Sequence, residues 1–382
     1  MTAALLTDKY ELTMLSAALR DGTAGRRTTF EVFARRLPAG RRYGVVAGTG
    51  RFLEALGEFV FDDAALDSVA SFLDPATLDY LRGFRFGGDV DGYREGDLYF
   101  PGSPVLTITG SFAECVVLET LTLSIFNHDS AIASAAARMV SAADGRPLIE
   151  MGSRRTHERA AVAAARAAYI AGFASSSNLE AGRLYGVPTA GTAAHSFTLL
   201  HDTEEDAFRS QLAALGNDTT LLVDTYDVTA AVTLGVELTQ GRLGAVRLDS
   251  GDLLTQAVDV RKLLDSLGAV NTKIIVTSDL DEYQIAALRA TPVNGYGVGT
   301  SLVTGSGAPT CGFVYKLVSR AESDQAEAPL LPVAKKSVNK TSIGGRKFAL
   351  RRLDWNVPLP QIGLREFVFG LLWIVGGACA IG

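Results

Sequence analysis

The chain has 382 residues, of which 47% are hydrophobic and 20% charged, and its formal net charge is −6 at pH 7. This composition is typical of a globular protein with a large core, and the length suits two domains or one large α/β unit with an appendage. The negative net charge and the lack of a basic stripe argue against a nucleic-acid partner.

The cysteines, Cys115, Cys311 and Cys379, lie far apart in the sequence. We therefore expect reduced thiols in a cytoplasmic protein rather than a disulfide framework. The opening residues, MTAALLTDKYELTM, contain no basic region followed by an apolar core, so we expect no secretory signal.

Residues 1–110 predict a mixed α/β domain. Within it, residues 10–19 have helical spacing, and residues 28–33 are rich in strand-forming side chains. Residues 97–100 and 105–109 are predicted as two strands joined by a Pro-Gly-Ser-Pro turn.

From residue 148 onward, short apolar runs alternate with helical patterns, and each run ends in polar residues. This alternation predicts a parallel sheet with right-handed crossovers, either an open doubly wound sheet or a closed barrel. A barrel brings all its polar strand ends to one mouth, so the spread of polar groups over seven runs favours an α/β barrel across residues 111–307. The runs end in MGSRR, FASSSN, TAAHS, VDTYD, RLDSGDL, TSDLD and GVGTS.

The run at residues 245–253, AVRLDSGDL, concentrates charge at the end of a predicted strand. Arg247 is a permanent cation, while Asp249, Ser250 or Asp252 could cap the following helix and leave its amides to an anion. The aspartates could also hold a divalent metal on a phosphorylated ligand. The alternative is an ordinary helix cap beside a surface ion pair, and the neighbouring strand ends favour the binding site.

His195 is the most informative histidine, because it follows the small residues Gly-Thr-Ala-Ala near a predicted strand end. A lone histidine there is more often structural, but beside several phosphate-binding strand ends its imidazole would act as a nucleophile toward a phosphoryl group or as an acid or base. Arg154 and Arg247 are candidates for clamping a carboxylate or phosphate. The four histidines lack zinc-site spacing, so we expect no fixed metal site. The histidines predicted as structural are His128, His157 and His201.

After residue 303 the alternation stops. Residues 335–347, KKSVNKTSIGGRK, predict either a solvated hairpin or the lid or wall of an anion site, and we expect about residues 308–353 to complete the N-terminal domain. Residues 354–382 form an atypical apolar tail, whose last sixteen residues carry no charge. That stretch is shorter than the ~20 residues that cross a bilayer as a helix, so a tail anchor is the less favoured alternative and we expect no membrane partner.

The chain resembles the nicotinate phosphoribosyltransferase family of type II phosphoribosyltransferases over about residues 5–353. The matching blocks are TDKYELTM, MGSRR, GFASSSN, GTAAHSF, VRLDSGDL, VGTSLVT and GGRK. The resemblance implies an irregular, TIM-like α/β barrel with an N-terminal mixed α/β domain, in a homodimer whose active sites are shared between subunits. The implied reaction forms nicotinate mononucleotide and pyrophosphate from nicotinate and phosphoribosyl pyrophosphate, in NAD salvage. ATP hydrolysis would be coupled to it through a phosphorylated histidine, with Mg²⁺ accompanying the pyrophosphate.

Carried over residue by residue, the resemblance implies that His195 is the phosphohistidine. Tyr10, Thr192 and Arg247 match positions associated with the nicotinate ring and carboxylate, with Tyr10 supplied by the neighbouring subunit. The positions that match the site for phosphoribosyl pyrophosphate are Gly299 and Thr300 at the 5-phosphate, and Arg154, Asp249, Ser250 and Asp279 around the ribose and pyrophosphate. Among these, Asp249 is also assigned a catalytic role and Arg154 a contact with nicotinate.

Nicotinate is favoured over nicotinamide because its carboxylate calls for an arginine. Arg154 and Arg155 leave the dicarboxylate quinolinate undecided as an alternative substrate. The family pattern stops after residue 354, which we interpret as a frameshifted or truncated end. The alternative function is therefore that of a truncated, inactive homologue that binds ligand or pairs with an active subunit.

Overall fold

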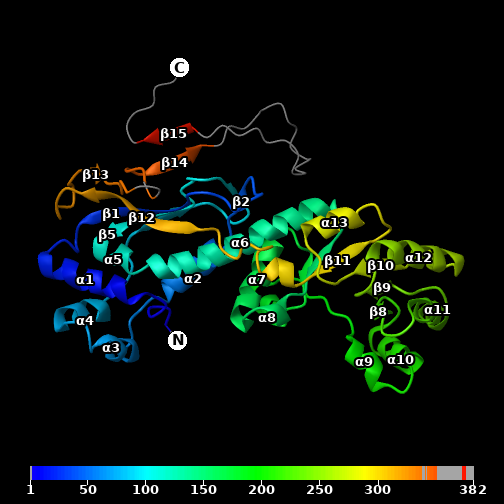
Figure 1. Ribbon diagram of the computed structural model, residues 1–382. Helices are drawn as coiled ribbons and strands as arrows, with labels where there is room; N and C mark the ends of the chain where they lie inside the picture. The colour runs from blue at the N-terminus through cyan, green and yellow to red at the C-terminus, as the bar shows by residue number, and fades with distance from the viewer. Residues whose placement is uncertain (1, 338–339, 341, 351–371, 376–382) are drawn as a thin grey trace. The chain divides into compact units, whose positions relative to one another are not determined.

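The chain divides into two compact units, each with its own sheet (Figure 1). Unit 1 consists of Met1–Ala131 and Thr310–Gly382, and unit 2 consists of Ile132–Pro309. No helix within the described part of the chain is long and apolar enough to cross a membrane. The computed structural model describes residues 2–337, 340, 342–350 and 372–375, so the predicted apolar tail lies largely outside it.

Unit 1 is built around an antiparallel sheet with the strand order β13-β12-β1-β5-β3. The strands predicted at 28–33 and 105–109 form β1 and β5. Strand β12 comes from the segment expected to complete the N-terminal domain, and it pairs with β1 from Thr28 to Ala34. The strands are β1 (Arg27–Ala34), β3 (Asp89–Gly92), β5 (Leu106–Ser111), β12 (Phe313–Ala321) and β13 (Leu330–Pro332), with two short pairs, β2 (Gly44–Val45) with β4 (Leu98–Tyr99) and β14 (Lys347–Leu350) with β15 (Leu372–Val375).

Helices in unit 1 begin where the sequence supplies a cap. Asp8 and Glu11 form a capping box at the start of α1, and Gly22, with φ of 80°, ends that helix in the left-handed conformation. Asp62 and Asp74 cap α3 and α4 by accepting a backbone N–H three residues further on. The helices are α1 (Lys9–Asp21), α2 (Thr49–Gly57), α3 (Asp63–Val69), α4 (Pro75–Arg82), α5 (Phe112–Val116) and α6 (Glu119–Ala143), which continues into unit 2.

Aromatic side chains join distant parts of the sequence in the core of unit 1. Phe30 of β1 stacks on Tyr315 of β12, with ring centroids 4.7 Å apart. Phe59, Phe61 and Phe84 pack edge to face in the same hydrophobic cluster. Buried aromatic pairs of this geometry stabilise a fold beyond the area they bury. The C-terminal strand β12 is therefore an integral part of this core.

A buried ion pair anchors the end of the predicted basic segment to β1. Lys347 Nζ lies 2.7 Å from Glu31 Oε2, and the backbone N–H of Lys347 donates to Glu31 Oε1 at 2.7 Å. The ammonium also donates to the carbonyl oxygens of Ile343 and Gly345. Burial raises the pKa of Glu31, while the contacts with Lys347 oppose that rise. Each charge is thus compensated inside the protein.

Unit 2 contains a parallel sheet with the order β7-β6-β11-β10-β9-β8, whose strands alternate along the chain with helices (Figure 1). The predicted α/β fold is confirmed, and its parallel strands form a half-barrel. The strands are β6 (Leu148–Glu150), β7 (Ser175–Ser176), β8 (Thr220–Leu222), β9 (Ala245–Leu248), β10 (Lys273–Val276) and β11 (Gly295–Val298). The helical segments are η1 (Ser153–Arg155), α7 (Glu158–Ile170), α8 (Leu179–Tyr185), α9 (His195–Leu200), α10 (Glu204–Leu215), α11 (Val228–Thr239), α12 (Leu253–Ser266), α13 (Glu282–Leu288) and α14 (Thr300–Val303).

One of the seven predicted strands does not form. The run at residues 187–196, which ends in TAAHS, makes a single bridge between Thr189 and Ser176. Its backbone bonds are from Ser176 N–H to the carbonyl of Pro188 and from Ala190 N–H to the carbonyl of Ser176, both at 2.9 Å. Pro188 has no N–H with which to continue a ladder, so the run remains a bridge rather than a strand.

Candidate active site

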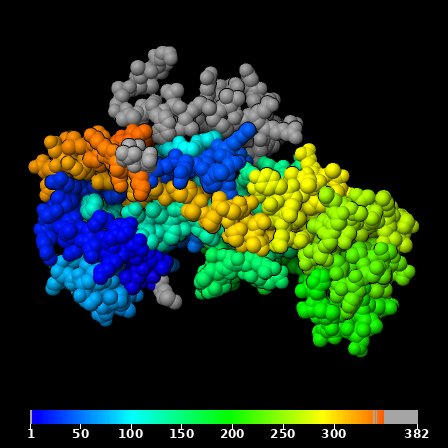
Figure 2. All heavy atoms as spheres, viewed as in Figure 1, coloured from blue at the N-terminus to red at the C-terminus, as the bar shows by residue number. Residues whose placement is uncertain are grey.

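The carboxyl ends of the unit 2 strands carry the polar residues singled out in the sequence. Parallel strands direct these ends to one edge of the sheet, where α/β folds place their sites. In Figure 2 the side chains of α9 to α12, coloured green to yellow-green, form one continuous part of the unit 2 surface. Hydrogen bonds and ion-pair contacts join the following residues at this edge: Thr192, His195, Asp224, Thr225, Arg247, Asp249, Ser250 and Thr277.

His195 is the first residue of α9 and is held from one side. Its Nδ1 lies 3.1 Å from Thr225 Oγ1. Its Nε2 lies 3.7 Å from Asp224 Oδ1 and 3.9 Å from Asp249 Oδ2, and the side chain is 40% exposed. Because Thr225 engages one ring nitrogen, the other is left facing two carboxylates and solvent. This arrangement suits an acid, a base or a phosphoryl acceptor.

Asp224, at the end of β8, is a site residue that the sequence reasoning did not select. Its side chain is only 2% exposed, and its Oδ2 accepts the backbone N–H of Asp249 at 2.9 Å and the hydroxyl of Ser250 at 2.6 Å. Its Oδ1, on the His195 side, is buried without a hydrogen-bond partner among the described residues. Asp224 therefore ties the loop after β9 to the imidazole.

A repeated spacing was the sequence signal for Asp224. Both VDTYD and LDSGD place two aspartates three residues apart after a strand. In each pair the second aspartate caps the next helix, Asp227 for α11 and Asp252 for α12. The first aspartate of each pair, Asp224 or Asp249, remains at the strand end beside His195. The predicted helix cap after β9 is thus Asp252.

Arg247 projects from β9 with hydrogen-bonding capacity to spare. One Nη donates to Thr192 Oγ1, whereas its Nε is buried without a partner in the described part of the chain. Burial lowers the pKa of the guanidinium, the charge of Arg154 lowers it further, and Asp249 and Asp224 oppose the shift. A buried N–H without an acceptor is costly, so this position favours binding of a carboxylate or phosphate.

Close backbone approach brings the β6 loop against the turn after β11. A Cβ on Gly152 would collide with Val303 and lie 3.0 Å from the carbonyl oxygen of Gly299, so only glycine fits there. Gly299 is the N-cap residue of α14, and Thr300 is its first helical residue. Arg154 lies two residues after Gly152 in η1, with an exposed side chain. The predicted phosphate-binding turn and Arg154 therefore share one part of unit 2.

The remaining predicted residues have fewer contacts. Asp279 is exposed in the loop after β10, and the preceding Ser278 has φ of 124°, a conformation that residues other than glycine rarely adopt. Tyr10 belongs to unit 1, where it lies on α1 and is 44% exposed. Partial burial, together with the nearby carboxylates Glu119 and Glu11, raises the pKa of its hydroxyl. The role predicted for Tyr10, a contact with nicotinate in the site of the neighbouring subunit, stays a prediction.

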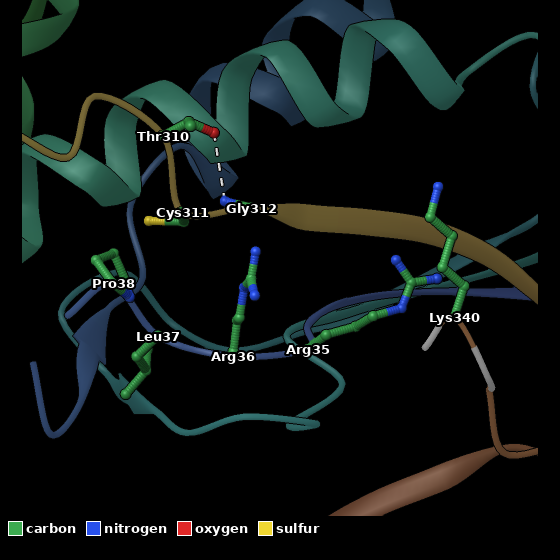
Figure 3. A pocket seen from close by; sticks show the side chains of 8 residues that line it. All are labelled: Arg35, Arg36, Leu37, Pro38, Thr310, Cys311, Gly312 and Lys340. Carbon is green, nitrogen blue, oxygen red and sulfur yellow. Dashed lines mark hydrogen bonds between the residues drawn. The ribbon is translucent and has the colours of Figure 1, made fainter. Parts of the chain in front are cut away.

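Unit 1 has a basic pocket of about 700 Å³ of its own. Figure 3 shows Arg35 and Arg36, just after β1, together with Lys340 from the predicted basic segment. The opposite wall comes from residues 310–312, where Thr310 Oγ1 accepts the Gly312 N–H at 3.3 Å (Figure 3). Arg35 Nε is buried without a hydrogen-bond partner among the described residues. These features favour the second interpretation of the basic segment, the wall of an anion site.

Known proteins match the chain over most of its length. The family model of the nicotinate phosphoribosyltransferase (NAPRTase) N-terminal domain matches residues 5–127. The nicotinate phosphoribosyltransferase pncB1 of Mycobacterium tuberculosis is 68% identical over 358 residues, which cover 92% of this chain and 78% of that protein. The human nicotinate phosphoribosyltransferase is 34% identical, over 82% of this chain and 71% of that one. The chain belongs to the nicotinate phosphoribosyltransferase family.

Solved structures agree with this membership in the nicotinate phosphoribosyltransferase family. The crystal structure of human nicotinic acid phosphoribosyltransferase superposes with a TM-score of 0.74 at 31% identity, covering 84% of this chain and 76% of that chain. A nicotinate-nucleotide pyrophosphorylase from Pyrococcus furiosus has the same TM-score at 24% identity, which shows the shared fold. The family recognised in the sequence is confirmed, while the individual roles of the site residues stay predictions.

Proposed function

We propose that the chain transfers the phosphoribosyl group of phosphoribosyl pyrophosphate to nicotinate, forming nicotinate mononucleotide and pyrophosphate in NAD salvage. Family membership supports this reaction, because relatives that are 68% and 34% identical to the chain are named nicotinate phosphoribosyltransferase. The structural observation that carries it is Arg247, whose partly buried guanidinium meets Thr192 and keeps a buried Nε without an acceptor. A nicotinate carboxylate would supply that acceptor.

In the transfer, the pyridine nitrogen of nicotinate bonds to the anomeric carbon of the ribose while the bond from that carbon to pyrophosphate breaks. Positive charge develops on the ribose and negative charge on the leaving group, so groups fixed in advance stabilise the transition state. Arg247 and Thr192 would orient nicotinate. The exposed Arg154 and the turn at Gly299 and Thr300 would bind the phosphates of the sugar.

Mg²⁺ is the metal we propose to accompany the pyrophosphate. The exposed carboxylate of Asp279 and the partly exposed carboxylate of Asp249 offer oxygen donors, which are the ligands that this ion prefers. The ion would neutralise charge on pyrophosphate. Ser250 and Asp224 would keep the Asp249 loop in place through their hydrogen bonds.

We further propose that His195 accepts a phosphoryl group from ATP. Nδ1 is engaged by Thr225, so Nε2 would form the N–P bond while the bond from the γ-phosphorus to ADP breaks. Water would later split the phosphohistidine to phosphate. Asp224 and Asp249, both within 4 Å of Nε2, would hold the imidazole in position before phosphorylation.

The test of the reaction is a pyrophosphate-release assay on the purified full chain, run with and without ATP. We expect nicotinate-dependent release that ATP increases. An inactive homologue would bind nicotinate and phosphoribosyl pyrophosphate without release, which would overturn the proposal.

Substrate choice is tested by isothermal titration with nicotinate, nicotinamide and quinolinate in separate runs. We expect nicotinate to bind most tightly, since Arg247 matches a single carboxylate. Tighter binding of nicotinamide would contradict the role given to Arg247, and tighter binding of quinolinate would show that Arg154 or Arg155 completes a dicarboxylate site.

We also propose a homodimer with shared active sites, in which Tyr10 of one subunit completes the site of the other. The basic pocket of Arg35, Arg36 and Lys340 in unit 1 would bind phosphate groups. Mixing the variants Tyr10→Ala and Arg247→Ala, each of which we expect to be strongly impaired alone, tests this arrangement. Shared sites predict that activity returns in mixed dimers, and lack of any recovery in dimers shown to have exchanged subunits would refute them.

A further inference from the structure

Glu150, the last residue of β6, is a buried carboxylate that the proposed mechanism does not use. It is 0% exposed, and no described lysine, arginine or histidine forms an ion pair with it. Its partners are neutral: Oε1 accepts the backbone N–H of Gly152, and Oε2 accepts the hydroxyl of Ser176 at 2.5 Å. Burial raises the pKa of Glu150, while these hydrogen bonds oppose the shift. A group so costly to bury calls for a role.

The carboxylate belongs to a closed ring of hydrogen bonds under η1. Ser176 Oγ, which donates to Glu150, accepts the backbone N–H of Asn178 at 2.9 Å. Asn178 Nδ2 in turn donates to Ser153 Oγ at 2.9 Å. Ser153 is the first residue of η1 and follows Gly152, whose N–H returns to Glu150. The ring thus joins the ends of β6 and β7 and carries the turn from which Arg154 projects.

The same carboxylate lies beneath the contact with the turn after β11. The position of a Cβ on Gly152 is 3.0 Å from Glu150 Oε1 and 3.0 Å from the carbonyl oxygen of Gly299. The backbone N–H of Met151 also donates to Val298 at 2.8 Å, one residue before Gly299. A shift of Glu150 would therefore move the β6 loop relative to the phosphate-binding turn.

We propose that Glu150 is a positioning residue for phosphoribosyl transfer, which holds the Arg154 turn against the Gly299 turn through Gly152 and Ser176 so that both grip one phosphorylated sugar. The inference rests on the proposed function. A glutamine keeps the shape of the side chain but offers one acceptor oxygen to two donors. It can therefore accept only one of the two hydrogen bonds, from Gly152 or from Ser176.

The variants Glu150→Gln and Ser176→Ala test this role in the full chain, with KM for each substrate, kcat and Tm as readouts. We expect both to raise KM for phosphoribosyl pyrophosphate about tenfold, because small misplacements of binding groups are costly, while KM for nicotinate changes less than about twofold. In the Arg154→Ala background, Glu150→Gln should add little further loss, since the two residues act as a unit.

Two controls separate positioning from general support of the fold. Glu282→Gln changes another buried glutamate of unit 2, one that accepts hydrogen bonds from Arg138 and Ser306. It should lower Tm without raising KM for phosphoribosyl pyrophosphate selectively over KM for nicotinate. Ser175→Ala changes the neighbouring serine of β7 and should resemble the parent chain.

The outcomes are distinct. A parent chain that releases no pyrophosphate overturns the proposed function and this inference together. With an active parent, unchanged KM for phosphoribosyl pyrophosphate in both variants overturns the inference alone, as does a parallel rise of both KM values with a lower Tm. If Glu150→Gln does not fold, Ser176→Ala and its KM split decide the matter.

Discussion

The two units treat buried charge in opposite ways. In unit 1, Lys347 and Glu31 are 4% and 0% exposed, and each charge has the other as its ion-pair partner. The ammonium also donates to two carbonyl oxygens, whereas Glu31 Oε2 has that ammonium for a partner and no hydrogen bond among the described residues. In unit 2, Arg247 keeps a buried Nε and Asp224 a buried Oδ1, both without hydrogen-bond partners in the described residues. A buried polar group left unsatisfied destabilises the fold, so it indicates a place where a ligand completes the structure.

The comparison separates a structural use of charge from a functional one. Replacing either Lys347 or Glu31 in unit 1 should lower the free energy of unfolding, because the remaining charge stays buried without a counter-charge. Removing the unsatisfied charge in unit 2 should cost activity and leave stability nearly unchanged. Arg35, with its buried Nε beside the basic pocket, is an instance in unit 1 of the pattern seen in unit 2.

The largest expected effect is that of Arg247→Ala. We expect kcat/KM for nicotinate to fall about 10²–10³-fold or more, because truncating one partner of a buried charged pair costs roughly 2–5 kcal/mol of binding. We expect Tm to equal or exceed that of the parent, because an unsatisfied buried group is removed. Steady-state kinetics and thermal unfolding measure both. Arg242→Ala, at an exposed arginine shortly before β9, is the control. Near-normal kcat/KM in Arg247→Ala would defeat the assignment.

Lys347→Met should have the opposite effect to Arg247→Ala, a loss of stability rather than of activity. It leaves Glu31 buried without its cation, and breaking such a pair costs about 3–5 kcal/mol of unfolding free energy. Denaturant unfolding measures the loss. Replacing both partners, as Glu31→Gln with Lys347→Met, should recover much of it, and Lys336→Met in the exposed part of the basic segment should have little effect. Equal stability of the single and double variants would contradict the compensation described here.

His195→Ala tests whether the imidazole beside Asp224 and Asp249 couples ATP to the reaction. We expect ATP stimulation to disappear while some ATP-independent synthesis remains, because the phosphoryl acceptor is lost and the binding groups for nicotinate are kept. Product formation with and without ATP gives the ratio. His201→Gln, at the C-cap of the same helix, should retain ATP stimulation. Unchanged stimulation in His195→Ala would exclude the phosphohistidine.

The smallest effect is a pH dependence at Asp74 in unit 1. Hydrogen bonds from Ser16 and Thr77 lower the pKa of this carboxyl to about 2, from an ordinary value of 3.8. A lowered folded pKa contributes stability above pH 3.8 that is lost as the pH falls through about 2. Asp74→Asn should therefore lower Tm at neutral pH, and the difference should vanish near pH 2. A difference in Tm between Asp74→Asn and the parent that stays constant on acidification would contradict this. Asp79→Asn, within the helix α4 that Asp74 caps, is the control.

Local patterns in the sequence sufficed for the alternation of strands and helices, for the family and for most of the residues at the strand ends. These features depend on neighbours in the chain, such as the aspartates that cap α11 and α12. One strand prediction was wrong: in the run at residues 187–196, Pro188 lacks the N–H that a ladder needs, and only one bridge forms.

The sequence by itself determined that Arg247, His195 and the glycine turn would follow parallel strands, because hydrophobic periodicity and polar loops are written into short stretches. Only the tertiary structure decided that Asp224 faces His195, that Glu150 closes a ring under Arg154, and that Lys347 meets Glu31 from 316 positions away. Such contacts join distant segments, and the identity of a partner across the fold depends on packing that no local spacing records.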